Sequence, residues 1–163
     1  IIEAISLRLA NVYGPSPTES LAKDRGTLSK ITRMKFELKN LHIYGNGEYL
    51  RDYIYIDDVV NAFLHASVMN YDILLNRNDI TLNVASGKGT SVKEVFSLIS
   101  HEVEKITGNK GVIKNIAWPK GVNKIEKRNY IASIELIKSL TGWEPSVSLE
   151  EGIQLLVKHY SKE

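Results

Sequence analysis

Apolar and polar residues alternate over several short stretches of the chain. Near its start, Ile5, Leu7 and Leu9 alternate with polar or small residues until a Gly-Pro pair. A period of two is typical of a strand, so a strand is expected within residues 3–13. The same pattern predicts four more strands, at LHIYG (41–45), RDYIYI (51–56), ITLNVAS (80–86) and VIKNIAW (112–118). The Gly-Asn-Gly sequence between the first two of these predicts a tight turn.

Other stretches repeat apolar residues every three or four positions, which is the spacing of one helix face. The first such stretch predicts a helix from Thr27 to about Asn40. A second helix is expected to start at Asp57 or Asp58, whose side chain would cap it. Its apolar positions include Val59, Val60, Phe63, Leu64 and Val68.

Three further helices carry clear start or stop signals. Ser91 and Glu94 form a Ser-x-x-Glu capping box, and Gly108 ends the helix that follows. A short helix is expected over 134–141, and a second capping box opens a terminal helix at Ser148. The expected buried stripe of the helix after Ser91 consists of Val92, Val95, Ile99, Val103 and Ile106.

Composition narrows the classes of function. A chain of 163 residues with 43% hydrophobic and 25% charged residues is typical of one soluble α/β domain. It has no cysteine, which excludes disulfides and thiolate chemistry, and its four histidines are scattered, so no metal site is expected. No apolar run is long enough to span a bilayer and no signal peptide is present, so a cytoplasmic protein without membrane contact is expected.

Charge gives little support for nucleic-acid binding. The formal net charge is only +2, although residues 110–128 hold five lysines and one arginine against one glutamate. Few aromatic residues are interleaved with these cations, so we expect no nucleic-acid partner.

Arg51 is the strongest candidate for a binding residue. On an alternating strand it shares one face with Tyr49, Tyr53 and Tyr55, where a guanidinium could bind a phosphate beside aromatic rings. The alternative is a surface arginine paired with an acidic neighbour, Asp52 or Glu48. Two other features favour an anion: the helix start near Thr27 offers free backbone N–H groups, and Asn11 closes the first strand, where ligand crevices of α/β folds lie.

Four segments carry a resemblance to a known family: LRLANVYGP, LHIYGNGEYLRDYIYIDDVVNAF, LNVASGKGTSVKEVF and LTGWEPSVSLEEGI. Together, and in this order, they resemble the C-terminal half of nucleotide-sugar epimerases and dehydratases of the extended short-chain dehydrogenase/reductase family. The resemblance implies the substrate-binding part of a Rossmann-type enzyme that oxidises a sugar carbon transiently with NAD. The sugar would be carried on UDP or dTDP.

The resemblance also implies roles for single residues. Arg51 is similar to the arginine that clamps the diphosphate, and Asn11 to the asparagine on the sugar side. Tyr44 occupies the family's position that stacks on the base. His42 occupies the position whose main chain recognises that base. Thr27 and Leu28 fall where a helix start offers N–H groups to the diphosphate, and Asn83 is a weaker phosphate candidate. The family's second phosphate-binding arginine has no clean counterpart, and the candidates are Arg128, Lys120, Lys124 and Lys127.

Two family features are expected upstream of this sequence, namely the glycine-rich dinucleotide loop and the Tyr-x-x-x-Lys catalytic pair. We therefore expect residues 1–163 to be the substrate-binding portion of a larger chain whose N-terminal dinucleotide-binding domain is absent here. The full-length protein would be an NAD-dependent epimerase, and the fragment alone would be inactive, without a catalytic residue of its own. A homo-oligomer is also expected, because the first strand would expose apolar edges.

Other functions stay open at this point. Within the same class, the second choice is a sugar 4,6-dehydratase or a related reductase or decarboxylase, since these differ from an epimerase in residues beside the catalytic tyrosine. A non-catalytic module that binds a nucleotide sugar, or another partner, is the alternative of a different class. The sugar, the base and the choice between NAD and NADP are not determined by the residues.

Overall fold

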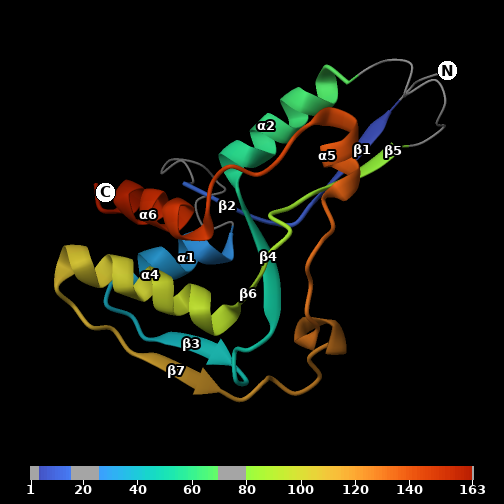
Figure 1. Ribbon diagram of the computed structural model, residues 1–163. Helices are drawn as coiled ribbons and strands as arrows, with labels where there is room; N and C mark the ends of the chain where they lie inside the picture. The colour runs from blue at the N-terminus through green and yellow to red at the C-terminus, as the bar shows by residue number, and fades with distance from the viewer. Residues whose placement is uncertain (1–3, 16–25, 70–79, 163) are drawn as a thin grey trace.

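The computed structural model describes residues 4–15, 26–69 and 80–162, which form a mixed α/β fold (Figure 1). The strands are β1 (Ile5–Leu9), β2 (Asn11–Tyr13), β3 (Leu41–Tyr44), β4 (Leu50–Tyr55), β5 (Ile80–Val84), β6 (Gly89–Ser91) and β7 (Ile113–Ile116). The helices are α1 (Thr27–Phe36), α2 (Ile56–Ser67), α4 (Val92–Thr107), the 3-10 helix η1 (Lys124–Lys127), α5 (Glu135–Thr141) and α6 (Leu149–Tyr160). None of the described helices has both the length and the apolar character needed to cross a membrane.

The first strand is two strands in two different sheets, so the prediction of a single strand over 3–13 was wrong. β1 runs parallel to β5, whereas β2 runs parallel to β4 with Asn11 opposite Tyr53. The chain passes from one sheet to the other at Ala10, whose N–H still donates to the carbonyl of Val84 at 3.0 Å. This step brings Asn11 to the strand that carries Arg51.

The Gly-Asn-Gly turn joins two strands that do not pair with each other. β3 runs parallel to β7, while β4 pairs with β2 and, antiparallel, with β6. Gly45 and Gly47 have φ angles of 67° and 76°, which favour glycine. The predicted strands and turn are therefore confirmed, and the turn leads the chain out of one sheet into another.

Apolar side chains form two clusters, one on each side of the fold. The larger cluster joins α1, α4 and α6, which lie together in Figure 1. Its members Ile99 and Leu156 are fully buried. The second joins α2 and α5 to the β1–β5 pair and contains Leu82, Ile137 and Trp143. β4 lies between them, because Tyr55 belongs to the first cluster and Ile54, on its opposite face, to the second.

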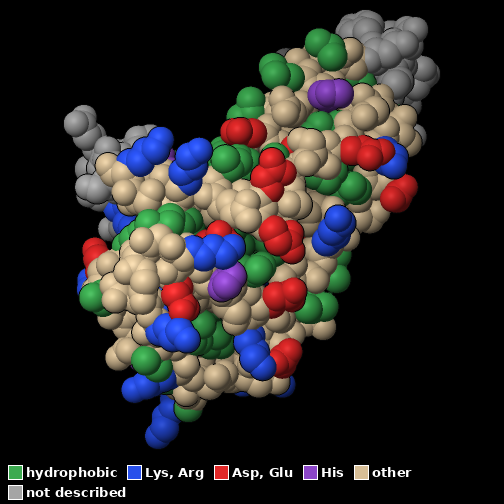
Figure 2. Space-filling view, turned by 60° about the vertical axis from the view of Figure 1, so that its left-hand side comes forward, with side chains coloured by type: hydrophobic (Ala, Val, Ile, Leu, Met, Phe, Trp, Pro, Cys, Tyr) green, Lys and Arg blue, Asp and Glu red, His purple; other side chains and the backbone are tan. Residues whose placement is uncertain are grey.

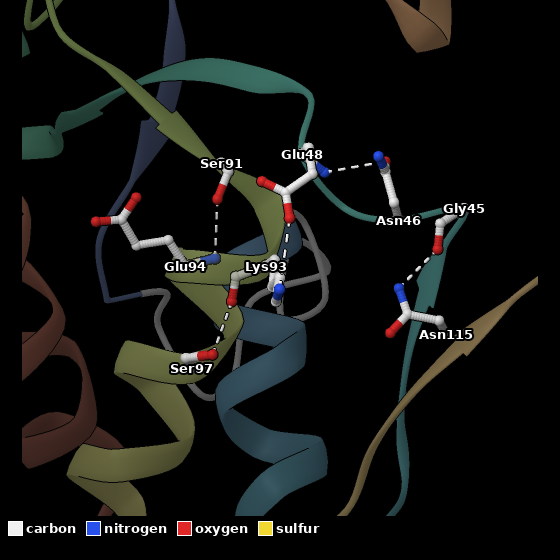
Figure 3. Close-up of polar contacts among 8 residues, drawn as sticks. All are labelled: Gly45, Asn46, Glu48, Ser91, Lys93, Glu94, Ser97 and Asn115. Atoms are coloured by element: carbon white, nitrogen blue, oxygen red, sulfur yellow. Dashed lines mark hydrogen bonds and ion pairs between the residues drawn. The ribbon is translucent and has the colours of Figure 1, made fainter.

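The predicted capping residues are confirmed where helices α4 and α6 begin. The hydroxyl of Ser91 accepts a hydrogen bond from the backbone N–H of Glu94 at 3.1 Å (Figure 3), and that of Ser148 accepts one from Glu151 at 3.1 Å. Gly108 follows α4 with a φ of 70°, as a left-handed stop requires. These local signals fix both ends of α4 without help from distant residues.

The expected cap of α2 was wrong. The helix begins at Ile56, and neither acidic residue of its first turn caps it through the side chain. The carboxylate of Asp58 is 1% exposed and instead accepts three hydrogen bonds, from the N–H and hydroxyl of Ser146 and the N–H of Val147. The donors of the loop before α6 thus use the buried carboxylate that the helix start would otherwise take.

Most of the large apolar residues of α2 face outward. Its buried stripe is Val59, Ala62 and Ala66. Figure 2 shows hydrophobic side chains on the upper arm of the molecule, where α2 lies. The exposed apolar residues of this helix are Val60, Phe63 and Leu64, and Val68 directly after it is exposed as well. Ile106 of α4, expected to be buried, is also exposed. The homo-oligomer expected from the sequence stays a prediction.

Lys35 of α1 is a buried cation. The side chain is 2% exposed, and its Nζ atom has no hydrogen-bond partner among the described residues. Burial lowers the pKa of Lys35 below its ordinary value, and Glu104 partly opposes that shift. The folded state therefore loses this proton at a lower pH than the unfolded chain does.

We expect Lys35→Met to stabilise the protein at neutral pH. In the wild type, the free energy of unfolding should rise with pH below about pH 10, because the unfolded chain keeps a proton that the folded state has released. The variant should lack this rise, and its Tm should increase by about 2–4 °C for each kcal/mol gained. Thermal unfolding between about pH 7 and 9.5 tests this, below the range where tyrosines titrate. Lys39→Met, at an exposed position, is the control, and an equal effect there would contradict the explanation.

Candidate functional site

A cavity of about 960 Å³ lies between the start of α1, the strands β3 and β4, and the start of α4. It brings together six of the eight residues that the sequence analysis proposed for substrate binding: Asn11, Thr27, Leu28, His42, Tyr44 and Arg51. These residues come from four separate elements, β2, α1, β3 and β4. They are spread over residues 11–51 of the sequence, and the fold brings them to one cavity.

Arg51 lies at the edge of this cavity and is held by main-chain oxygen atoms. Its Nη1 atom donates to the carbonyls of Leu50 and Arg128, and Nη2 donates to that of Glu126 at 2.7 Å. A guanidinium has five N–H groups, so three hydrogen bonds leave Nε–H and one Nη2–H for a ligand. No described carboxylate lies within ion-pair distance of Arg51.

The alternative of a surface ion pair is therefore wrong. The carboxylate of Asp52 is buried on the opposite face of β4, and that of Glu48 pairs with Lys93 at 3.4 Å (Figure 3). Arg51 keeps its positive charge at the cavity without an acidic partner among the described residues, as a site for an anion requires.

The tyrosines expected beside Arg51 divide between the cavity and the core. Tyr49 and Tyr53 line the cavity, whereas Tyr55 is buried against Tyr13 with ring centroids 5.5 Å apart. Burial raises the pKa of Tyr53 to about 12, while the nearby charge of Arg51 acts in the opposite direction. Tyr53 is thus a neutral hydroxyl at physiological pH, able to donate a hydrogen bond next to the guanidinium.

The start of α1 forms another wall of the cavity. Gly26 precedes the helix with a φ of 102°, and no side chain caps the first turn. The hydroxyl of Ser29 donates to the carbonyl of Gly14 at 3.0 Å, which ties the helix start to the end of β2. Thr27 and Leu28 follow at the cavity wall. Uncapped N–H groups and the positive end of the helix dipole favour an anion at this wall.

Aromatic rings line the end of the cavity farther along β3. Tyr44 stacks on Trp118, with centroids 5.2 Å apart and planes 21° from parallel, and Tyr49 meets the same indole edge-on at 6.0 Å. The turn below them is tied to β7 by a hydrogen bond from Asn115 to the carbonyl of Gly45 (Figure 3). Trp118 was missed in the sequence, because its place depends on β7 lying parallel to β3.

A smaller cavity of about 260 Å³ shares Asn11, Arg51 and Glu126 with the larger one. The amide of Asn11 donates to the carbonyl of Asp52 at 2.9 Å, which fixes it beside Arg51. Arg128 also lines this cavity. Of the other three cations proposed as a second phosphate ligand, Lys127 lies 5.8 Å from the centre of the Trp118 ring, and none lines either cavity.

Asn83 lies apart from the other proposed residues. Its amide donates to the carbonyl of Ser133 at 3.1 Å, and it lines neither cavity. Its role at the phosphate stays a prediction. Within the described ranges, no three His, Asp or Glu side chains gather closely enough to hold a metal ion.

Short parallel strand pairs covered by helices, with a cavity that Arg51 and two aromatic rings line, describe an α/β fold with a candidate ligand site. Comparison with known proteins gives the family. The family model described as GDP-mannose 4,6 dehydratase matches residues 2–156. The chain belongs to this family, among the nucleotide-sugar epimerases and dehydratases of the extended short-chain dehydrogenase/reductases.

Relatives and solved structures agree with this assignment. A putative UDP-glucose 4-epimerase of Methanocaldococcus jannaschii is 32% identical over 96% of this chain and 45% of its own length. The crystal structure of UDP-glucose 4-epimerase from Thermotoga maritima with UDP-glucose is 36% identical, with a TM-score of 0.73 over 97% of this chain and 46% of that one. A tyrosine-to-phenylalanine mutant of UDP-glucuronic acid 4-epimerase from Bacillus cereus, solved with UDP-4-deoxy-4-fluoro-glucuronic acid and NAD, shares the fold at 23% identity, with a TM-score of 0.75 over 99% of this chain and 46% of that one. The chain thus spans about half the length of the relatives it matches.

Proposed function

We propose that this chain is the nucleotide-sugar-binding portion of an NAD-dependent nucleoside-diphosphate-sugar epimerase. The observation that carries the proposal is Arg51, which lies at the junction of two cavities and has no carboxylate partner within residues 4–15, 26–69 and 80–162. A diphosphate is the part of a nucleotide sugar that lies between base and sugar, so one cation between two compartments suits it. The similarity to a UDP-glucose 4-epimerase solved with UDP-glucose supports this reading.

Each compartment suits one part of such a ligand. The diphosphate would lie against Arg51 and the start of α1, where charge and free N–H groups combine. The base would enter the larger cavity toward the aromatic wall of Tyr44 and Trp118. The sugar would lie toward the smaller cavity, with Asn11 and Arg128 beside it. Such contacts hold the substrate in place and orient it, while the chemical step needs other groups.

The described residues do not fit a nicotinamide cofactor. β1 and β5 form a sheet of only two parallel strands, and no glycine-rich loop of the dinucleotide type follows either strand. We propose that the dinucleotide-binding domain lies outside this sequence and holds NAD there. Accordingly, we assign no catalytic residue to this chain, and we expect it to be inactive by itself.

Two alternatives remain within reach of experiment. A 4,6-dehydratase, reductase or decarboxylase would use the same binding residues, and we prefer an epimerase because the relatives described above at 32% and 36% identity carry that name. A non-catalytic module would bind the same ligand without ever meeting a cofactor.

Calorimetric titration tests the proposed function directly. We expect UDP and dTDP to bind the 163-residue protein, inorganic phosphate to bind far more weakly, and NAD not to bind measurably. GDP serves as the control for the base, since a purine is larger than the pyrimidines proposed here. If neither UDP nor dTDP releases or absorbs heat at millimolar concentration, the proposed function is wrong.

A further inference from the structure

We propose that Asp52 is a positioning residue for the anion site: its buried carboxylate fixes a strap, residues 124–132, whose carbonyl groups hold Arg51. The consequence for ligand binding rests on the proposed function. The effect on the strap itself does not, because it concerns contacts within the chain.

The carboxylate of Asp52 is fully buried and bound entirely by hydrogen-bond donors. Its Oδ1 atom accepts from the N–H and the hydroxyl of Ser86, at 2.8 and 2.7 Å. Its Oδ2 atom accepts from the N–H of Gly87 at 3.1 Å and from that of Ala132 at 3.2 Å. The side chain is 0% exposed. Four hydrogen bonds thus tie β4 to the turn after β5 and to the end of the strap.

Three successive residues of β4 hold the strap. Leu50 accepts from the N–H of Tyr130 at 3.0 Å and donates to the side chain of Asn129 at 2.9 Å. Arg51 donates to two strap carbonyls, and Asp52 accepts from Ala132. Figure 1 shows η1, which lies within the strap, beside the lower end of β4. The strap therefore follows the strand at the point where the two cavities meet.

Asp52 also reaches the other side of the site. Its carbonyl accepts the hydrogen bond from Asn11, the residue that lines both cavities beside Arg51. Because side chains alternate along a strand, Asp52 lies behind the face that Arg51 presents to the ligand. Asp52 thus positions two groups. Its main-chain carbonyl holds the amide of Asn11, and its carboxylate holds the strap.

An amide at this position would break only part of the arrangement. In Asp52→Asn, Oδ1 can still accept from Ser86, but Nδ2 would face the N–H groups of Gly87 and Ala132. The two backbone N–H groups and the Nδ2 group are all donors, so these buried groups would lack acceptors, which lowers the free energy of unfolding. The end of the strap should then detach from β4, and the carbonyls that orient Arg51 should become free to move. A guanidinium without a fixed orientation binds a phosphate more weakly, because it must be ordered during binding.

Asp58 provides a matched control. Its carboxylate is 1% exposed and accepts three hydrogen bonds, from Ser146 and Val147, in the same manner. It lies on α2 and lines neither cavity. Asp58→Asn should therefore reduce stability about as much as Asp52→Asn does, without any effect on the strap.

Hydrogen exchange and UDP titration on the wild type and both variants test the proposal. We expect backbone amides of residues 124–132 to exchange about tenfold faster in Asp52→Asn, and UDP to bind about tenfold more weakly. Asp58→Asn should match the wild type in both measurements. The proposal is overturned if strap exchange is the same in the two variants.

A milder pair of variants covers the case in which Asp52→Asn does not fold. Ser86→Ala removes the hydroxyl that donates to the carboxylate of Asp52, and Ser146→Ala removes the equivalent donor to the carboxylate of Asp58. Only Ser86→Ala should speed exchange of the strap, by about threefold, and equal exchange in the two would overturn the proposal. If the wild type binds neither UDP nor dTDP, the proposed function fails, while the exchange measurement still decides whether Asp52 fixes the strap.

Discussion

Replacement of Arg51 by alanine should remove UDP and dTDP binding at concentrations where the wild type is saturated. The guanidinium offers Nε–H and one Nη2–H to the ligand, and hydrogen bonds to charged groups contribute about 1.5–3 kcal/mol each. Loss of two of them corresponds to a weakening of at least about 100-fold. The substitution also releases the carbonyls of Glu126 and Arg128, so the strap should loosen as well. Calorimetry with UDP measures the first effect and hydrogen exchange of residues 124–132 the second.

Two controls separate charge from geometry in this experiment. Arg51→Lys keeps a cation but loses the fork of N–H groups, so we expect binding between that of the wild type and that of the alanine variant. Arg8→Ala removes an exposed arginine of β1 that lines neither cavity, and should leave UDP binding unchanged. Wild-type affinity in Arg51→Ala would remove Arg51 from the site.

Substitution of the two tryptophans of the chain should affect different properties, stability for Trp143 and ligand binding for Trp118. Trp143 is 1% exposed, packs in the cluster under α2 and donates to the carbonyl of Asp58 at 3.2 Å. Trp143→Ala should lower the free energy of unfolding by about 3–5 kcal/mol, as is usual for a large aromatic residue in a core. At about 2–4 °C for each kcal/mol, Tm should fall by roughly 10 °C.

Trp118 is the matched comparison, because it lines the larger cavity and stacks on Tyr44. Trp118→Ala should change stability far less and weaken UDP binding, since the base would lose part of its aromatic wall. Thermal unfolding followed by circular dichroism, together with calorimetry, separates the two effects. A larger loss of stability from Trp118→Ala than from Trp143→Ala would contradict the assignment of these residues to cavity and core.

Signals that act between neighbours in the chain predicted most of the helices. Ser91, Gly108 and Ser148 act within four residues of their own helix, so the ends of α4 and the start of α6 could be read from the sequence. Asp58 shows the limit of this approach. Its position suggests a cap, yet its partners lie 88 and 89 residues away, and no local pattern reveals them.

The same distinction applies to the site. The face that Arg51 shares with Tyr49 and Tyr53 follows from strand periodicity, and the structure places all three at one cavity. The groups that hold the guanidinium could not be predicted, because Glu126 and Arg128 lie 75 and 77 residues further along the chain. Trp118 was missed for a similar reason, since only the pairing of β3 with β7 brings it to Tyr44.

Gly45 sets how closely the indole of Trp118 can pack against the turn after β3. A Cβ atom at this turn would lie 2.6 Å from Nε1 of the indole, closer than two such atoms can approach. Any larger residue at position 45 would therefore displace the indole, which lines the larger cavity, and change the space available there. Under the proposed function, a substitution at position 45 would thus alter the choice between a one-ring and a two-ring base through Trp118, without itself lining the cavity.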